Sequence, residues 1–109
     1  MPESIFDLQA ELCQTMSNAT RLRIVHALRD GPHCVGELAG ALELGQAAVS
    51  QHLAALRSRG IVAATRRGGE VIYRITNPKI ERICDLMREV LAEQAASRTE
   101  LIRALRRSR

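Results

Sequence analysis

Residues 46–75 decide the fold, and they read QAAVSQHLAALRSRG over 46–60 and IVAATRRGGEVIYRI over 61–75. In the first segment apolar residues recur every three or four positions, as in an amphipathic helix, and a glycine follows its end. In the second segment the pattern is extended on both sides of Gly68-Gly69, and two glycines supply the positive φ angles of a tight hairpin turn. The stretch predicts a helix over 46–59 followed by a β-hairpin over 61–75.

Three more helices are expected before this stretch. Apolar residues at helical spacing predict them over about 4–16, between the N-cap candidate Ser17-Asn18 and the stop at Gly31-Pro32, and over 35–42. A tight turn containing Gly45 joins the last of these to helix 46–59, which is typical of a helix-turn-helix unit spanning 35–59. With the hairpin over 61–75 as its wing, this unit predicts a winged helix-turn-helix, mainly α with a small β-hairpin.

A long apolar stripe follows the hairpin. Asn77-Pro78 supplies an N-cap and a proline at the first helical position, and the stripe predicts a helix over 78–96. A basic C-terminal end over 97–109 follows a break expected near Ala96-Ser97, and the sequence leaves open whether this end is helical. Since no linker or repeat interrupts the chain, we expect a single domain over 1–109.

Length and composition exclude several classes of protein. A chain of 109 residues has room for one domain, and so short a chain covers its apolar surface more easily as a homodimer. Aromatic residues make up only 2% of the chain, which argues against a single-strand binder built on base stacking. No apolar run is long enough to span a bilayer, and the three cysteines cannot all pair within one chain, so we expect a cytoplasmic protein without a membrane partner.

Positive charge is concentrated in the middle and at the end of the chain. Residues 1–45 hold three arginines and six carboxylates, a net charge of −3. Residues 46–76 hold five arginines and one carboxylate, a net charge of +4, and residues 77–109 hold eight basic and five acidic residues, a net charge of +3. No carboxylate occurs between Gln46 and Gly69. A basic winged helix predicts duplex DNA as the partner, with the helix in the major groove and the wing along the backbone.

The polar side chains of this unit are suited to reading DNA. Gln pairs with adenine edges, Arg with guanine, and Ser with bases or phosphates, whereas the wing arginines are expected to hold phosphates. A merely solvated helix face is the alternative, but such a face usually interleaves acids, and this one has none. The predicted DNA-binding residues are Gln46, Ser50, Gln51, His52, Arg57, Arg66, Arg67 and Arg74.

Four segments together resemble the ArsR/SmtB family of bacterial winged-helix repressors over roughly residues 5–92. They are SNATRLRI (17–24), CVGELA (34–39), QAAVSQHL (46–53) and GGEVIYRI (68–75). The resemblance implies a homodimer held by the first and last helices, 1–16 and 78–96. It also implies a palindromic operator and an inducer that favours the DNA-incompetent conformation. Gly45 stands where the family usually has a capping serine.

The sensor sites of the family are only partly matched. The positions of the zinc-type site hold Asn77, Lys79, Val90 and Glu93. The arsenic- and cadmium-type motif becomes Cys34-Val35-Gly36-Glu37-Leu38 and retains one thiol, and the positions of the sulfur-reactive cysteine pair hold His26 and Ala92.

Three cysteines on separate helices, Cys13, Cys34 and Cys84, remain as candidate metal ligands. Arsenite and other thiophilic ions prefer thiolates, and Cys34 stands at a predicted helix start beside His33, where the helix dipole favours the thiolate. Cys13 and Cys84 lie on apolar stripes, so packing is their alternative role.

Two other functions compete with this interpretation. An enzyme built on Cys34 with His33 or His52 would need a third orienting group and a pocket, and adjacent His33 and Cys34 diverge on a helix, so no catalytic residue is expected. A constitutive or redox- or persulfide-responsive DNA-binding regulator without a metal site keeps the fold and stays the alternative to an arsenite- or metal-induced repressor. Operator affinity measured with and without these agents discriminates between the two.

Overall fold

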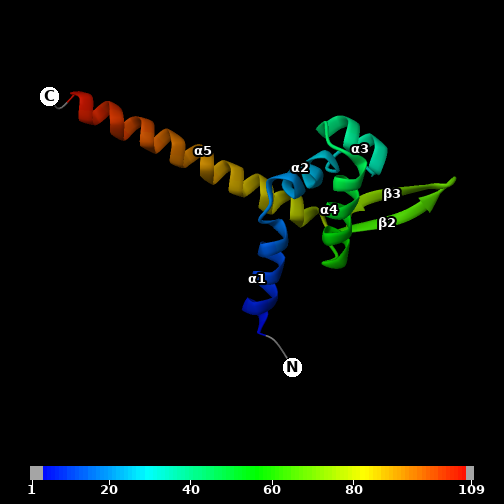
Figure 1. Ribbon diagram of the computed structural model, residues 1–109. Helices are drawn as coiled ribbons and strands as arrows, with labels where there is room; N and C mark the ends of the chain where they lie inside the picture. The colour runs from blue at the N-terminus through cyan, green and yellow to red at the C-terminus, as the bar shows by residue number, and fades with distance from the viewer. Residues whose placement is uncertain (1–3, 108–109) are drawn as a thin grey trace.

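The computed structural model describes residues 4–107. The predicted first helix over 1–16 and the predicted basic end over 97–109 each include a few residues, 1–3 and 108–109, that lie outside this range. Its elements are α1 (Ile5–Met16), α2 (Ala19–Ala27), β1 (His33–Cys34), α3 (Val35–Leu42), α4 (Gln46–Ser58), β2 (Val62–Arg67), β3 (Glu70–Ile75) and α5 (Pro78–Arg107). Figure 1 shows a body formed by α2, α3, α4 and the strands, from which α1 and α5 project in different directions. The predicted winged helix-turn-helix, mainly α, is confirmed.

Local sequence explains where three of the helices begin. Ser4 and Asp7 form a capping box at the start of α1, and the Asn18 side chain accepts from the Arg21 backbone N–H at 3.1 Å at the start of α2. At α5 the side chain of Asn77 accepts from the Lys79 backbone N–H at 3.0 Å, so its predicted capping role is confirmed. These caps satisfy N–H groups that lack partners inside the helices.

The hairpin is built as predicted, but it carries a third strand that the sequence did not reveal. β2 and β3 pair antiparallel from Val62 opposite Ile75 to Arg67 opposite Glu70. Gly68 and Gly69 form the turn with φ of 56° and 85°, angles that cost glycine little. The two-residue β1 pairs with the other edge of β3, so the sheet order is β1-β3-β2.

The core lies inside the helix-turn-helix and against the base of the wing. Ile24, Val49, Leu53 and Leu56 are fully buried, and they pack with buried residues of α3 and β2. By contrast, Thr15 is the one buried residue of α1, and Cys84 is the one buried residue of α5 within the part the structure describes. The body therefore has its own core, while α1 and α5 leave their apolar faces uncovered.

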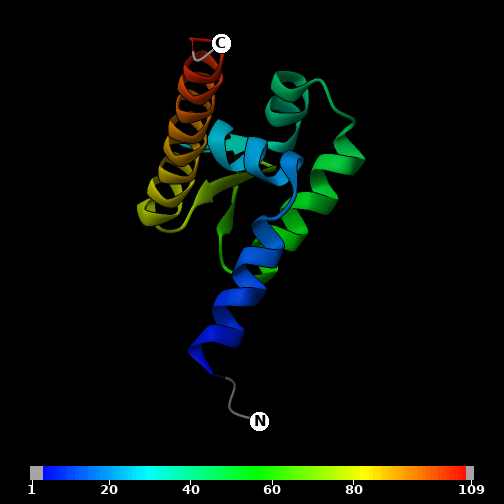
Figure 2. The ribbon, with the colours of Figure 1, turned by 90° about the vertical axis from the view of Figure 1, so that its left-hand side faces the viewer.

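α5 is a single helix of 30 residues that passes through Ala96-Ser97 without a break. At 1.5 Å per residue it is about 45 Å long. The Cα radius of gyration is 18.1 Å, against about 13 Å for a compact chain of this length. In the view of Figure 2 the free end of α5 lies above the body and the free end of α1 lies below it. Over residues 4–107, no helix is both long and apolar enough to cross a membrane.

Candidate nucleic-acid interface

The outward face of α4 presents the polar side chains that were predicted to read bases. Gln46, Ser50 and Gln51 are exposed, whereas Val49 and Leu53, which alternate with them along the helix, are fully buried. Core packing on one face thus fixes the orientation of the other. Gly45 is the N-cap of α4 and offers no side-chain hydrogen bond, so the first N–H groups of α4 lack a side-chain acceptor.

His52 lies differently from the other predicted residues of α4. It is half-buried, and its Nδ1 accepts a hydrogen bond from Arg21 Nε at 3.2 Å. Arg21 also donates from Nη1 to the Thr15 carbonyl at the end of α1, at 3.2 Å. These two bonds connect α4 to the junction of α1 and α2. Arg21 is thus a positioning residue that the sequence did not reveal, because its contact with His52 spans 31 positions.

A cavity lies between α4 and one face of the wing. It has a volume of about 290 Å³ and is lined by Arg57, Ala64, Arg66 and Val71, and we call it the α4–wing groove. Arg57 stands on α4 and Arg66 on β2, and both are exposed. Two of the predicted cations therefore border one hollow directly beside the polar face of α4.

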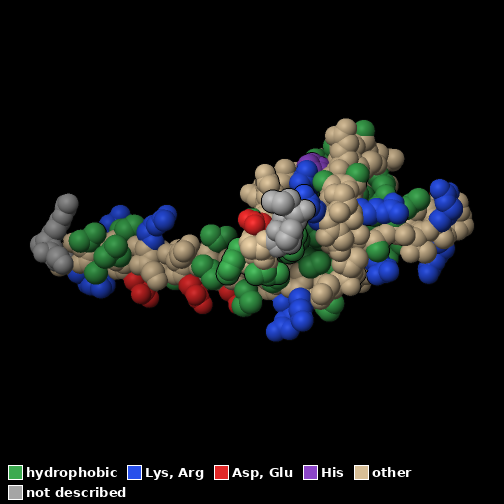
Figure 3. Space-filling view, turned by 90° about the horizontal axis from the view of Figure 1, so that it is seen from below, with side chains coloured by type: hydrophobic (Ala, Val, Ile, Leu, Met, Phe, Trp, Pro, Cys, Tyr) green, Lys and Arg blue, Asp and Glu red, His purple; other side chains and the backbone are tan. Residues whose placement is uncertain are grey.

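The other two wing arginines lie on the opposite face of the hairpin. Side chains alternate along a strand, so Arg67 faces away from Arg66, and the pairing of Arg67 with Glu70 places Arg74 on the same side as Arg67. Both are exposed. The four predicted arginines therefore form two pairs, one in the α4–wing groove and one on the outer face of the wing. In Figure 3, Lys and Arg side chains stand out around the hairpin end of the molecule.

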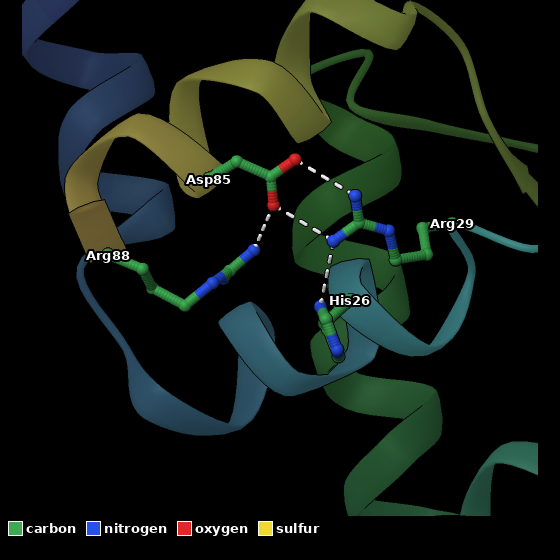
Figure 4. A network of polar contacts seen from close by, with 4 residues as sticks. All are labelled: His26, Arg29, Asp85 and Arg88. Atoms are coloured by element: carbon green, nitrogen blue, oxygen red, sulfur yellow. Dashed lines mark hydrogen bonds and ion pairs between the residues drawn. The ribbon is translucent and has the colours of Figure 1, made fainter.

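A polar network ties α5 to the end of α2 and the turn that follows it (Figure 4). Arg29 donates from Nη1 and Nη2 to the two oxygens of Asp85 at 2.8 and 2.9 Å, and Arg88 donates to the same carboxylate. The hydrogen bond from Arg29, helped by the one from Arg88, holds the pKa of Asp85 below its usual range. His26 Nδ1 lies 3.4 Å from Arg29 Nη1. Since α2 packs against α3 and α4, the network links α5 to the helix-turn-helix.

The three cysteines occupy two places. Cys13 and Cys84 line one apolar cavity of about 400 Å³ between α1 and α5, here called the α1–α5 groove. Cys13 is exposed, whereas burial raises the pKa of the Cys84 thiol. Cys34 does not line this groove.

Cys34 stands at the start of α3, where its backbone N–H donates to Glu37 at 3.0 Å and lowers the pKa of that carboxyl. Within residues 4–107 of one protomer, no three His, Cys, Asp or Glu side chains are placed to hold a metal ion. A three-thiolate site thus does not fit the single chain.

The helix-turn-helix, the exposed polar face of α4 and the basic wing define this chain as a winged helix-turn-helix protein of the DNA-binding class. A family model described as "Bacterial regulatory protein, arsR family" matches residues 18–64. The chain is 35% identical over 105 residues to Rv0081 of Mycobacterium tuberculosis, an HTH-type transcriptional regulator, covering 95% of this chain and 92% of that protein. The chain belongs to the arsR family.

Other relatives agree with this assignment. The chain is 39% identical over 82 residues to the HTH-type transcriptional repressor SmtB of M. tuberculosis, covering 75% of this chain but only 61% of that repressor. The crystal structure of Rv0081 superposes with a TM-score of 0.80 at 35% identity, over 90% of this chain and 99% of that one. The solution structure of a homodimeric winged helix-turn-helix DNA-binding domain, Mb0332 from Mycobacterium bovis, gives 0.76 at 31% identity and 84% coverage of both chains.

Proposed function

We propose that the protein is a homodimeric transcriptional repressor that binds a palindromic operator in duplex DNA. The observation that carries the proposal is the exposed, acid-free polar face of α4, which borders a groove flanked by Arg57 and Arg66. An α-helix fits the major groove of B-DNA, and a basic hairpin beside it reaches the adjacent backbone or minor groove.

Each group of side chains has its own role in this proposal. Gln46, Ser50 and Gln51 read base edges, because amide and hydroxyl groups match adenine and other polar edges of the major groove. The arginines bind phosphates and set the position of the protein without reading sequence. The division of the wing arginines over two faces allows the wing to contact phosphates on both of its sides.

The dimer follows from apolar surface that one chain leaves exposed. Isolated exposed apolar residues are common, but a continuous stripe marks an interaction surface. In a two-fold dimer the same surfaces of both copies meet, and two recognition helices face two half-sites of an operator. The exposed large apolar residues of α1 and α5 are Ile5, Phe6, Leu8, Leu12, Ile83, Leu86, Met87, Val90, Leu91, Leu101, Ile102 and Leu105.

A selection from a random duplex library tests the proposal. The dimer is expected to enrich a two-fold symmetric sequence whose half-site centres lie about one helical turn apart. Its affinity for that sequence is expected to fall with salt, with a slope of about −0.9 for each phosphate neutralised. A selection without enrichment, or an affinity that ignores salt, would contradict it.

The inducer is proposed to act through cysteine thiolates, with arsenite or another thiophilic ion as the favoured class. Cys13 and Cys84 support this assignment because they line the same groove between α1 and α5. Because α1 and α5 are also the proposed dimer surfaces, a ligand in the groove can favour a conformation with lower operator affinity. Cys34, the third predicted ligand, stands apart from this pair, so its part in induction is tested separately.

Operator affinity measured with arsenite, cadmium, nickel and a persulfide donor distinguishes the inducers. A response to arsenite or a metal that Cys13→Ser abolishes and Cys34→Ser leaves intact is the expected result. A response to the persulfide donor alone would favour the redox alternative. If no agent changes affinity, the protein is a constitutive DNA-binding regulator.

A further inference from the structure

A histidine and an arginine are joined on the flank of α4 that faces the junction of α1 and α2. His52 is half-buried on α4, and Arg21 is half-buried in the first turn of α2. Arg21 Nε donates to His52 Nδ1 at 3.2 Å, and Arg21 Nη1 donates to the Thr15 carbonyl at 3.2 Å. Two hydrogen bonds to different elements therefore fix the guanidinium against the imidazole.

The position of His52 around α4 places it away from the wing. At 3.6 residues per turn, His52 and Arg57 lie about 140° apart, on opposite edges of the buried stripe of the helix. Arg57 borders the α4–wing groove, so His52 borders the other flank. Gln51 lies on the exposed face between the two flanks.

A helix that enters the major groove lies between two rows of phosphates, one along each edge of the groove. The groove is about 12 Å wide, and a helix with its side chains is about 10–12 Å across, so both flanks come near a row. On the wing side, Arg57 and Arg66 are placed for one row. On the other flank, His52 is placed for the second row.

The hydrogen bond from Arg21 determines which nitrogen of His52 carries the proton. A guanidinium donates and has no acceptor, so the Nδ1 atom that it meets is unprotonated. A neutral imidazole whose Nδ1 accepts carries its hydrogen on Nε2. Within residues 4–107, Nε2 has no hydrogen-bond partner and is not buried. His52 thus presents an N–H donor to solvent on this flank.

We infer that His52 donates from Nε2 to a phosphate oxygen of the operator, on the flank of α4 opposite the wing, and that Arg21 holds the imidazole in the tautomer this contact needs. Phosphate oxygens only accept, so they match a nitrogen that can only donate. The guanidinium of Arg21 adds positive charge beside the contact, which favours a phosphate there. The inference rests on the proposed function, since it requires α4 to enter the major groove.

A base edge fits His52 less well as a partner. Side chains at the centre of the exposed face of α4, such as Gln51, point to the floor of the groove, where base edges lie. His52 stands at the border of the buried stripe, and its ring is held toward α2 by Arg21. A side chain in this position meets the wall of the groove, which is made of phosphates and sugars.

Nuclear magnetic resonance of the DNA-free chain tests the tautomer. Long-range ¹H–¹⁵N correlations distinguish protonated from unprotonated ring nitrogens, and the loss of one set of signals in His52→Gln identifies those of His52. At pH 8 the expected result is a protonated Nε2 and an unprotonated Nδ1. Arg21→Ala should shift both nitrogens toward a mixture of tautomers. A protonated Nδ1 in the unmodified chain would overturn the inference.

Operators with single methylphosphonates test the contact itself, because each replaces one charged phosphate oxygen with a methyl group. One position in each half-site is expected at which the replacement weakens the unmodified chain about tenfold and the His52→Ala chain less than threefold. This position should differ from the one at which the Arg66→Ala chain becomes insensitive. The absence of any position with this pattern would contradict the phosphate contact.

Variants of His52 give a third measurement. His52→Ala is expected to lower affinity for operator and random duplex alike by about tenfold, because a hydrogen bond to a charged group is lost. The salt slope should stay unchanged, unlike that of Arg66→Ala, because a neutral imidazole neutralises no phosphate. His52→Gln, whose amide can donate from near the position of Nε2, should recover most of the loss.

His26→Ala is the matched control. His26 Nδ1 lies 3.4 Å from Arg29 Nη1, a similar pairing of histidine and arginine, but it borders α5 and not α4. Its replacement should change affinity less than twofold.

The outcomes separate this contact from the proposed function. If the unmodified chain selects an operator and His52→Ala binds it equally well, the inference fails alone. A loss confined to the operator would overturn it in favour of a base contact. An unmodified chain that selects no duplex would overturn the proposed function and this contact with it.

Discussion

Gln51 and Arg66 are exposed side chains of the same surface, yet they are expected to act on DNA in different ways. Gln51 stands on α4, where an amide can pair with a base edge, so Gln51→Ala should lower affinity for the selected operator by about 1–3 kcal/mol. The affinity of the Gln51→Ala chain for a random duplex should hardly change. Fluorescence anisotropy with both duplexes measures the difference, and equal losses would remove Gln51 from the base-reading residues.

Arg66, in contrast to Gln51, is expected to contact a phosphate and not a base. Arg66→Ala should weaken binding to operator and random duplex alike, because a phosphate is present in every sequence. The slope of log affinity against log salt should fall by about 0.9. A loss confined to the operator would instead show that Arg66 reads a base.

The carboxylate of Asp85 makes the stability of the folded chain depend on pH. Its hydrogen bonds from Arg29 and Arg88 lower its pKa in the folded state below the value in the unfolded chain. The unfolded chain therefore binds this proton first, and the stabilisation, complete at neutral pH, is lost as pH falls through about 4 and below. Thermal unfolding from pH 7 to pH 3 should show a smaller drop in Tm for Asp85→Asn than for the unmodified chain. An equal drop in Tm would contradict the role of this network.

Single residues also show what the sequence could and could not predict about the site. The exposure of Gln46, Ser50 and Gln51 followed from the apolar spacing of α4. The separation of Arg66 from Arg67 could have been found from strand alternation. The contact of Arg21 with His52 could not, because it depends on how α2 packs against α4.

At the scale of elements, the wing depends on the backbone of its turn. Gly69 has φ of 85°, where a side chain is strained although nothing lies within 4 Å of the added Cβ. Gly69→Ala should therefore lower the free energy of unfolding by about 1 kcal/mol or more and weaken DNA binding. Gly40→Ala is the matched control, because Gly40 lies inside α3 with equal space and without positive φ, and it should stabilise by about 0.5–1 kcal/mol. Urea unfolding measures both, and a neutral Gly69→Ala would contradict the turn's role.

The elements that the sequence predicted are those with a strong local signal. Apolar spacing and the paired glycines were sufficient for α1 to α4 and the hairpin. β1 was missed because two residues carry no alternation, and its pairing is set by the free edge of β3. The expected break in α5 did not occur, since Ala96 and Ser97 include no glycine or proline and allow a helix to continue.

At the scale of the whole molecule, the exposed stripe of α5 predicts that folding and assembly are coupled. Tm should rise with protein concentration, because a dimer is stabilised by mass action. Leu91 is 63% exposed in the protomer, so Leu91→Glu should remove this concentration dependence while leaving the far-UV circular dichroism spectrum unchanged. A concentration-independent Tm for the unmodified chain would contradict the dimer.

Guanine N7 protection on the selected operator tests the central claim most directly, because this atom is reached only from the major groove. If α4 of each protomer enters that groove, methylation by dimethyl sulfate should be reduced at guanines in both half-sites, symmetrically and about one helical turn apart. The Gln51→Ala chain should need a higher protein concentration to give the same protection, because it binds the operator more weakly. Unchanged methylation under a saturating excess of protein would contradict major-groove recognition by α4.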